Sequence, residues 1–448
     1  MGVRGPGAAS GLFDPRVVEG LIEAEKIPIE NAKKRKEKVQ GERDEFGKLN
    51  EFVAGLDTSL NKLKTKIDFY KMKIESSHPD IMDATVKGYT LPGNYEFEVR
   101  GLAKSEKQLA YGFPDKDKTP VGFGYMLIQR EGQEDLELTI EPGSTLEDVA
   151  NAINGKDAGL KAMIVNTKYQ PDSFRLLVMS EKSGKESKIF IDEDTTFLEF
   201  KEQVAGRNLD VLFEDVPVTD EDNTLEALVD GVVFNVKRAE PGTRVQMNVT
   251  YDLDTTAKSI DEFVKKYNEL AKFINGQFQV DPKTGKAGIL AGDSSIKGIM
   301  RSLQGSLGLP INSSGKYRTL ADIGITTNPK TGELDFADAK VRAALAEDYE
   351  GVAKVFVRTE QAVGVAARLS DTIKGFRDAQ SGVLKSRTRA LDSIIKSQDE
   401  QIANKEAQLG KKEENIKRRF TALEGQLSGL KAQGDFLKQR FQGGGGGE

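Results

Sequence analysis

The sequence predicts an α+β protein. Both chain ends are expected to form a discontinuous helical coiled-coil stem and a helical leg domain, with β-rich head lobes inserted between them. Apolar residues recur at heptad spacing near both ends, and short alternating apolar and polar stretches fill the middle. A heptad repeat is typical of helices that bury a narrow stripe on another helix, whereas alternation is typical of half-buried strands.

The N-terminal stripe is expected on one long helix that ends near Tyr70. A short amphipathic segment comes first, and Pro28 is expected to close it and to enter the first turn of the long helix. The apolar positions of that segment are Val17, Val18, Leu21 and Ile22. The stripe alternates steps of three and four residues and consists of Phe46, Leu49, Val53, Leu56, Leu60, Leu63 and Ile67.

The C-terminal stripe is expected on a helix over about 384–441. Its members are Ile395, Ile402, Leu409, Ile416, Phe420, Leu423, Leu427, Leu430 and Leu437. Two interpretations stay open: the two stripes pack on each other as an intramolecular core, or they bind another chain. Because the last helix is longer than the first, we expect its excess, from Leu423 to Phe441, to contact a partner.

Glycines interrupt both predicted stem helices. They are Gly41, Gly47 and Gly55 in the first helix and Gly410, Gly425, Gly429 and Gly434 in the last. Each glycine in a helix interior costs about 1 kcal/mol relative to alanine. We therefore expect the stem helices to be marginal in the isolated chain and to become ordered on assembly.

The changes of periodicity predict five segments along the chain. In order, they are an N-terminal segment with the stem helix (1–75), two β-rich head lobes (76–200 and 201–255), a helical leg domain (256–375), and the last helix with a glycine tail (376–448). A helix over 144–154 is expected to begin with Ser144 as N-cap and Glu147 three residues later. One hairpin is expected near 323–336 and one helix over 337–356.

Composition excludes several classes of site. The chain has no cysteine, which excludes disulfides, thiol catalysis and zinc–thiolate centres. A net charge of −6 favours neither nucleic acid nor membrane as a partner. No apolar run approaches the roughly 20 residues of a membrane span. Residues 1–11 lack the apolar core of a signal peptide, so any export would have to use a route without a cleaved signal.

Charge is unevenly distributed. Residues 192–230 contain thirteen acids and two bases, whereas 374–441 contain nine acids and fifteen bases. The acidic stretch is interpreted as a solvated face of the head, with a partner-facing surface as the alternative. The basic excess is read either as a surface for an acidic partner helix or chaperone, or as solvated.

The sequence offers little evidence of catalysis. His78 is the only histidine and lies in a predicted loop, and the acidic clusters 192–194 and 220–222 lack EF-hand spacing. The basic run KKRK at 33–36 is flanked by acids and is read as a solvated helix face. No phosphate-loop, zinc-protease or serine-hydrolase motif occurs. We expect no catalytic residue, no cofactor and no metal.

Six segments in chain order carry a resemblance to a known family. They are SGLFDPRVVEGLIEAEKIPIE (10–30), LPGNYEFEVRGLAKSEK (91–107), STLEDVANAIN (144–154), NTLEALVDGVVFNVKRAEPGTRVQMNVTYD (223–252), TLADIGITTNPKTGELDFADAKVRAAL (319–345) and FTALEGQLSGLKAQGDFLKQRF (420–441). Together they resemble the bacterial flagellar filament cap proteins, also called hook-associated protein 2. The head lobes are short for that family, and the tail GGGGGE (443–448) is not one of its motifs.

The resemblance implies a non-enzymatic protein at the extracellular tip of the flagellum. It implies a ring-like homo-oligomer that promotes insertion of flagellin, with hook-associated junction proteins as further partners. It also implies export by the flagellar type III apparatus and a chaperone that holds the C-terminal helix beforehand. A cytosolic coiled-coil scaffold or adaptor with a β-rich head stays open as the alternative.

Overall fold

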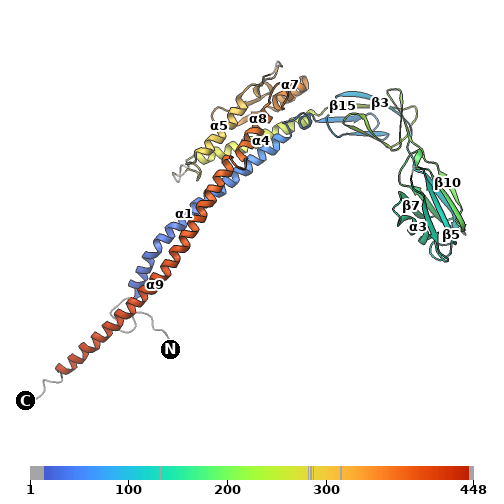
Figure 1. Ribbon diagram of the computed structural model, residues 1–448. Helices are drawn as coiled ribbons and strands as arrows, with labels where there is room; N and C mark the ends of the chain where they lie inside the picture. The colour runs from blue at the N-terminus through green and yellow to red at the C-terminus, as the bar shows by residue number, and fades with distance from the viewer. Residues whose placement is uncertain are drawn as a thin grey trace, which may run out of the picture. The chain divides into compact units, whose positions relative to one another are not determined.

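The computed structural model describes residues 15–131, 133–280, 282, 285, 287–312 and 315–442 (Figure 1). They form two compact units, one from the residues up to Thr65 together with those from Ala257 onward, and the other from Lys66–Thr256. We call these unit 1 and unit 2. The Gly-rich segment 1–11 and the tail 443–448 lie outside the described residues. Helices and antiparallel sheets are both present, so the predicted α+β class is confirmed.

Unit 1 is mostly helical. Its elements are α1 (Pro15–Asn61), most of α4 (Leu253–Phe278), α5 (Ser294–Gly308), the 3₁₀ turn η2 (Ala321–Ile323), β16 (Ile325–Thr327), β17 (Leu334–Phe336), α6 (Asp338–Glu347), α7 (Tyr349–Phe356), α8 (Val365–Arg377) and α9 (Val383–Gln442). Strands β16 and β17 form the expected hairpin. Helices α1 and α9 lie side by side and form the stem (Figure 1).

Helix α1 corrects two predictions. It runs through Pro28 without interruption, and it ends at Asn61 rather than near Tyr70. Pro28 is exposed, whereas Ile29 and Ala32 are buried against Ile402 of α9. A proline inside a helix removes one backbone hydrogen bond. We attribute the continuity of α1 to this packing of Ile29 and Ala32 against α9.

The C-terminal half of α1 lies inside the leg domain. Helix α4 runs antiparallel to it: Phe52 stacks near Phe273 with ring centroids 5.0 Å apart, and Lys62 pairs with Glu262 at 2.7 Å. Helix α8 also packs on α1, where the Ser370 hydroxyl donates to Asp57 at 3.2 Å. The heptad positions of this half are therefore covered by the chain itself.

The region after the hairpin differs from the predicted single helix over 337–356. It forms α6 and α7, which are separated at Asp348, where φ is −150° and ψ is 82°. The Asp348 carboxylate accepts a hydrogen bond from the Gly351 amide at 2.8 Å and so caps α7. Aspartate often ends a helix in this way because its side chain competes for backbone donors. Helix α8, which was not predicted, follows with Val365, Leu369 and Ile373 buried.

Unit 2 consists of two lobes. The split lobe draws strands from both ends of the unit and has sheet orders β1-β15-β3-β11-β12 and β13-β14-β2. Its strands are β1 (Met72–Ser76), β2 (Met82–Val86), β3 (Gly93–Gly101), β11 (Leu209–Phe213), β12 (Val216–Asp220), β13 (Thr224–Val229), β14 (Val232–Val236) and β15 (Arg244–Tyr251). The short helix α2 (Lys66–Phe69) precedes β1.

The inserted lobe lies between β3 and β11 in the chain. It contains β4 (Lys107–Phe113), β5 (Gly122–Arg130), β6 (Leu136–Ile140), α3 (Leu146–Asn154), β7 (Leu160–Asn166), β8 (Phe174–Ser180), the 3₁₀ turn η1 (Lys185–Ser187), β9 (Ile189–Thr196) and β10 (Phe200–Val204). Two sheets, β10-β4-β8-β7 and β6-β5-β9, share one apolar core with α3.

This topology differs from the predicted lobe boundaries of 76–200 and 201–255. Strand β3 pairs with both β11 and β15, so the first strands of unit 2 belong with the last. Alternation identifies a strand but not its pairing partner, so the insertion was not visible from the pattern. A smaller correction concerns α3: its N-cap is Thr145, not Ser144, and Asp148 rather than Glu147 completes the capping box.

Candidate assembly surface

The two stem helices are held in antiparallel register by ion pairs. Four pairs join α1 to α9: Glu25–Lys412 at 2.6 Å, Lys33–Glu406 at 2.7 Å, Lys36–Asp399 at 2.5 Å and Arg43–Asp392 at 3.2 Å. Such exposed pairs contribute only about 0–1 kcal/mol each. Their arrangement matters more for register and orientation than for stability.

The basic run at 33–36 was predicted to be a solvated helix face, but two of its lysines pair with acids of α9. Lys33 and Lys36 reach across to acids of α9 instead of lying only in solvent. A signal was present in the sequence. Asp392, Asp399 and Glu406 recur every seven residues, in step with the apolar stripe, as charges beside a coiled-coil seam do.

The predicted stripe residues fall into three groups by burial. Those of the N-terminal stripe up to Leu63 are all buried within unit 1: Phe46, Leu49, Val53, Leu56 and Leu60 in α1, and Leu63 just after it. Ile402 of α9 is buried, and its half-buried neighbours along the stripe are Ile395, Leu409, Ile416, Phe420 and Leu427. Three members near the end of α9 are exposed, namely Leu423, Leu430 and Leu437.

Ile67 is a correction. It was predicted to continue the first stripe, but it lies in α2 of unit 2 and its exposed fraction is 68%. The chain leaves the helical path after Asn61, and the 3.5-residue phase ends there. Phe69 and Tyr70 are the buried residues of that segment.

The end of α9 carries an exposed apolar stripe, which we call the tail stripe: Leu423, Leu430, Phe436 and Leu437. Their exposed fractions are 44%, 63%, 63% and 52%. On the register of the ion pairs, Pro15 at the start of α1 lies near Phe420, and α9 continues beyond it (Figure 1). Several large apolar side chains exposed on one helix end are typical of an interaction site.

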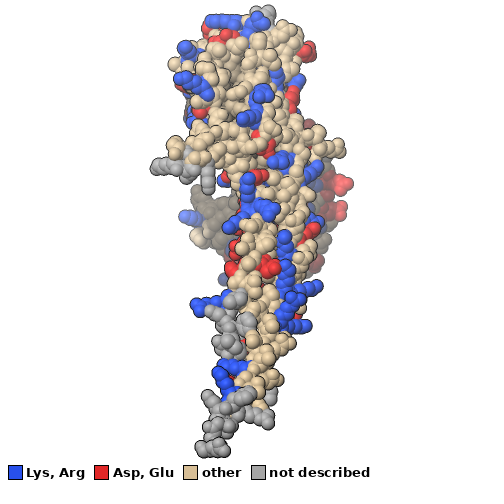
Figure 2. All heavy atoms as spheres, turned by 90° about the vertical axis from the view of Figure 1, so that its left-hand side faces the viewer, with Lys and Arg blue, Asp and Glu red and all other residues tan. Residues whose placement is uncertain are grey.

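Basic side chains accompany the tail stripe. Lys417, Arg418 and Arg419 are exposed one to two turns before Leu423. Figure 2 shows Lys and Arg side chains spread along this end of the stem. An apolar stripe beside positive charge can bind an amphipathic segment with acidic flanks.

Glycines in α9 stand in open space. A Cβ added at Gly410, Gly425, Gly429 or Gly434 would meet no atom within 4 Å, whereas one added at Gly41 in α1 would lie 2.7 Å from Cδ1 of Ile289. No other element of unit 1 therefore packs so closely on α9 that glycine is needed at these positions. That the stem is marginal in the free chain stays a prediction.

We expect the triple variant Gly425→Ala/Gly429→Ala/Gly434→Ala to stabilise the end of α9 by about 1 kcal/mol per position, because alanine loses less conformational entropy in a helix. Amide hydrogen exchange across 420–440 should become slower by the corresponding factor. Gly41→Ala is the matched control, since its methyl group meets Ile289 and no gain is expected. Unchanged exchange in the triple variant would contradict the idea that α9 is marginal.

Comparisons with known proteins bear on the whole chain. The family model described as flagellar hook-associated protein 2 C-terminus matches residues 206–432, and its N-terminal counterpart matches residues 10–106. The chain belongs to the flagellar hook-associated protein 2 family. Among similar proteins, the B-type flagellar hook-associated protein 2 of Pseudomonas aeruginosa is 28% identical over 77% of this chain and 78% of that protein. Flagellar hook-associated protein 2 of Escherichia coli K12 is 23% identical over 97% of each.

A solved structure supports the fold. The D1-D2-D3 domains of the flagellar cap protein FliD from Escherichia coli match with a TM-score of 0.67 at 24% identity, over 78% of this chain and 99% of that one. Membership of the hook-associated protein 2 family makes the chain a structural protein of the flagellar cap. The alternative of a cytosolic scaffold is not favoured.

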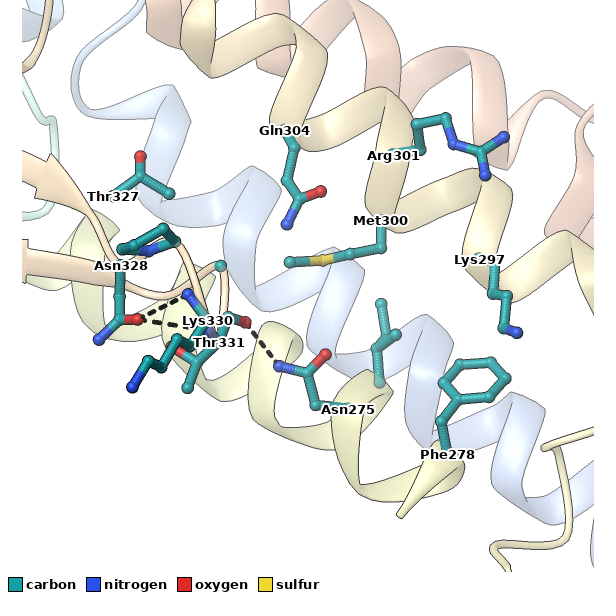
Figure 3. Close-up of a pocket in the computed structure, with 13 residues that line it drawn as sticks. Asn275, Phe278, Lys297, Met300, Arg301, Gln304, Thr327, Asn328, Lys330 and Thr331 are labelled. Atoms are coloured by element: carbon teal, nitrogen blue, oxygen red, sulfur yellow. Dashed lines mark hydrogen bonds between the residues drawn. The ribbon is translucent and has the colours of Figure 1, made fainter.

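Unit 1 also contains a cavity. It has a volume of about 400 Å³ and lies between α4, α5 and the loop that joins β16 to β17 (Figure 3). Lys297, Arg301 and Lys330 line it, and no Asp, Glu or His does. Figure 3 shows Lys297 and Arg301 on α5 and Lys330 on the loop, while Met300 and Gln304 point toward the loop. This lining holds no carboxylate pair of the kind used in acid–base chemistry.

The remaining candidates are explained by local structure. A hydrogen bond of 2.9 Å joins Nδ1 of His78 to the Ser77 hydroxyl in the turn between β1 and β2. The Asp220 carboxylate accepts a hydrogen bond from the Asp222 amide at 3.0 Å, as in an ordinary turn. Among the described residues, no group of three potential ligands could hold a metal ion, and no helix has the length and apolar character needed to cross a membrane.

Proposed function

We propose that this chain oligomerises at the distal tip of the flagellar filament and promotes insertion and polymerisation of flagellin there. The tail stripe is the observation that carries the proposal. The stripe of α1 is covered by the leg domain of the same chain, whereas Leu430 and Leu437 stay more than half exposed. A heptad stripe left open in this way is suited to a partner helix.

The tail stripe is proposed to have different partners in turn. Before export, an export chaperone would cover it; in the cap, a neighbouring copy of the chain would. Export is proposed to proceed without a cleaved signal peptide, and flagellin and hook-associated junction proteins are the proposed neighbours of the finished cap. Because assembly covers apolar surface, it would also stabilise the stem by mass action.

The double variant Leu423→Asp/Leu430→Asp tests this role. Two carboxylates in an apolar contact would have to be desolvated, so we expect loss of chaperone binding or of cap assembly. Sedimentation of the purified chain, binding of the chaperone and swimming motility of the cells measure the effect. Leu91→Asp is a matched control, since Leu91 is 62% exposed in unit 2. Wild-type secretion and motility in the double variant would refute the proposal.

A further inference from the structure

The four-stranded sheet of the inserted lobe has an outward face with an apolar centre. Leu109 of β4 is opposite Leu177 of β8, which in turn is opposite Met163 of β7, so these three side chains form a row across the sheet. Tyr111 and Met163 have exposed fractions of 55% and 43%. The shared core lies on the other face, where Ala110, Ala162 and Val178 are buried.

Basic side chains surround this apolar centre. Lys107 and Lys161 flank Met179 in the next row, and Lys201 is opposite Leu109. Arg175 also lies on this face, and its Nε is buried without a hydrogen-bond partner. Among the described residues, none of these four cations forms an ion pair. The outward positions of the four strands contain no Asp or Glu. We call this surface the basic face.

The three-stranded sheet of the same lobe presents the opposite character. Phe123, Tyr125 and Phe190 have exposed fractions of 58%, 42% and 60%. Leu127 of β5 lies between two acids in register, Glu137 of β6 and Asp192 of β9. The outward positions of these strands, as far as their side chains are described, carry no Lys or Arg. We call this surface the acidic face.

The two faces are complementary and belong to one rigid lobe. Both sheets pack on a single core, so each face points away from it and their relative orientation is fixed. Each has an apolar centre, and their charges are opposite. A contact between two different surfaces of identical chains is heterologous, and it repeats from copy to copy until it closes into a ring or continues as a helix.

We propose that the basic face of one copy docks on the acidic face of the next copy, so that inserted lobes of neighbouring chains form a continuous heterologous contact. This inference rests on the proposed homo-oligomer and assigns it a second interface besides the stem. Once stems associate, the heads are held at high effective concentration, so a contact of modest intrinsic affinity is sufficient. The charges also determine which faces meet, because two basic faces or two acidic faces repel each other.

Charge reversal tests the contact in the full chain. Variant A, Lys161→Glu/Lys201→Glu, cancels the positive charge of the basic face, and variant B, Glu137→Lys/Asp192→Lys, reverses the two described acids of the acidic face. We expect each alone to associate at least about tenfold more weakly than the wild type in sedimentation equilibrium. An equimolar mixture of A and B should regain association, because the acidic faces of A meet the basic faces of B.

A control with the same change of net charge as variant A separates this effect from general repulsion. Lys73→Glu/Lys87→Glu alters two exposed cations of the split lobe and should associate like the wild type. If A and B also associate like the wild type, or if their mixture gains nothing, the interface is wrong while the homo-oligomer stands. A wild-type chain that stays monomeric at every concentration overturns both proposals.

The absence of cysteine provides an independent measurement. In the double variant Met163→Cys/Tyr125→Cys, each face carries one thiol, and mild oxidation of the assembled chain should give a ladder of disulfide-linked multimers. Either single variant should give no ladder, because a heterologous contact does not bring two copies of the same residue together. Dimers from a single variant, or no ladder from the double variant, would overturn the proposal.

Discussion

Replacing Leu56 with alanine lowers the free energy of unfolding of unit 1 by an expected 2–5 kcal/mol or so, whereas the same replacement at Leu430 leaves it nearly unchanged. Leu56 has an exposed fraction of 0% and Leu430 one of 63%. The buried side chain would leave a cavity among the helices of the leg domain. The exposed one would lose only contacts with water. Two leucines at corresponding positions of heptad stripes are thus expected to differ in what they contribute: Leu56 to folding stability, and Leu430 to binding a partner.

Urea unfolding followed by circular dichroism at 222 nm measures both variants, because most of the helix lies in unit 1. Sedimentation of the same samples gives the complementary result: Leu430→Ala should weaken self-association, and Leu56→Ala should not affect it directly. Equal destabilisation by the two substitutions would contradict the division of the stripes into a core half and a partner half.

Periodicity was sufficient to predict the stem and most of the leg helices. The repeats that underlie α1 and α9 extend over many turns, so the loss of single positions such as Gly47 or Gly410 does not hide them. The residues of the tail stripe were also found from this pattern, apart from Phe436. Their partner-binding role stays a prediction.

Periodicity could not predict which part of the chain, or which partner, covers each stripe. Leu56 and Leu430 occupy equivalent heptad positions, and only the packing of α4 and α8 around α1 distinguishes them. The same limit explains the lobe boundaries, since β3 alternates like any other strand but pairs with β11 and β15, more than a hundred residues away. Helix α8 could have been found, because Val365, Leu369 and Ile373 have helical spacing.

Asp293 connects three parts of unit 1. Its carboxylate caps α5 by accepting from the Ser295 amide at 2.9 Å, and it accepts a charge-assisted bond from Nε of Arg387 in α9 at 2.7 Å. The Arg387 guanidinium lies 5.9 Å from the ring centre of Phe46 in α1. Burial alone would raise the pKa of Asp293, but the hydrogen bonds from Ser295 and the charge of Arg387 outweigh it and hold that pKa below its ordinary value of 3.8.

We expect Asp293→Ala to destabilise unit 1 by about 1–2 kcal/mol through loss of the cap, with a further loss because Arg387 is left without its partner. Asp293→Asn keeps a cap acceptor and removes only the charge, so its cost at pH 7 should be smaller.

A carboxyl with a lowered pKa in the folded state contributes stability that is complete above the ordinary pKa and is lost as pH falls through the folded value. The difference between wild type and Asp293→Asn should therefore shrink on acidification from pH 7 toward pH 3. Urea unfolding at both pH values measures it, and a difference that stays constant would show that the charge of Asp293 does not couple α5 to α9.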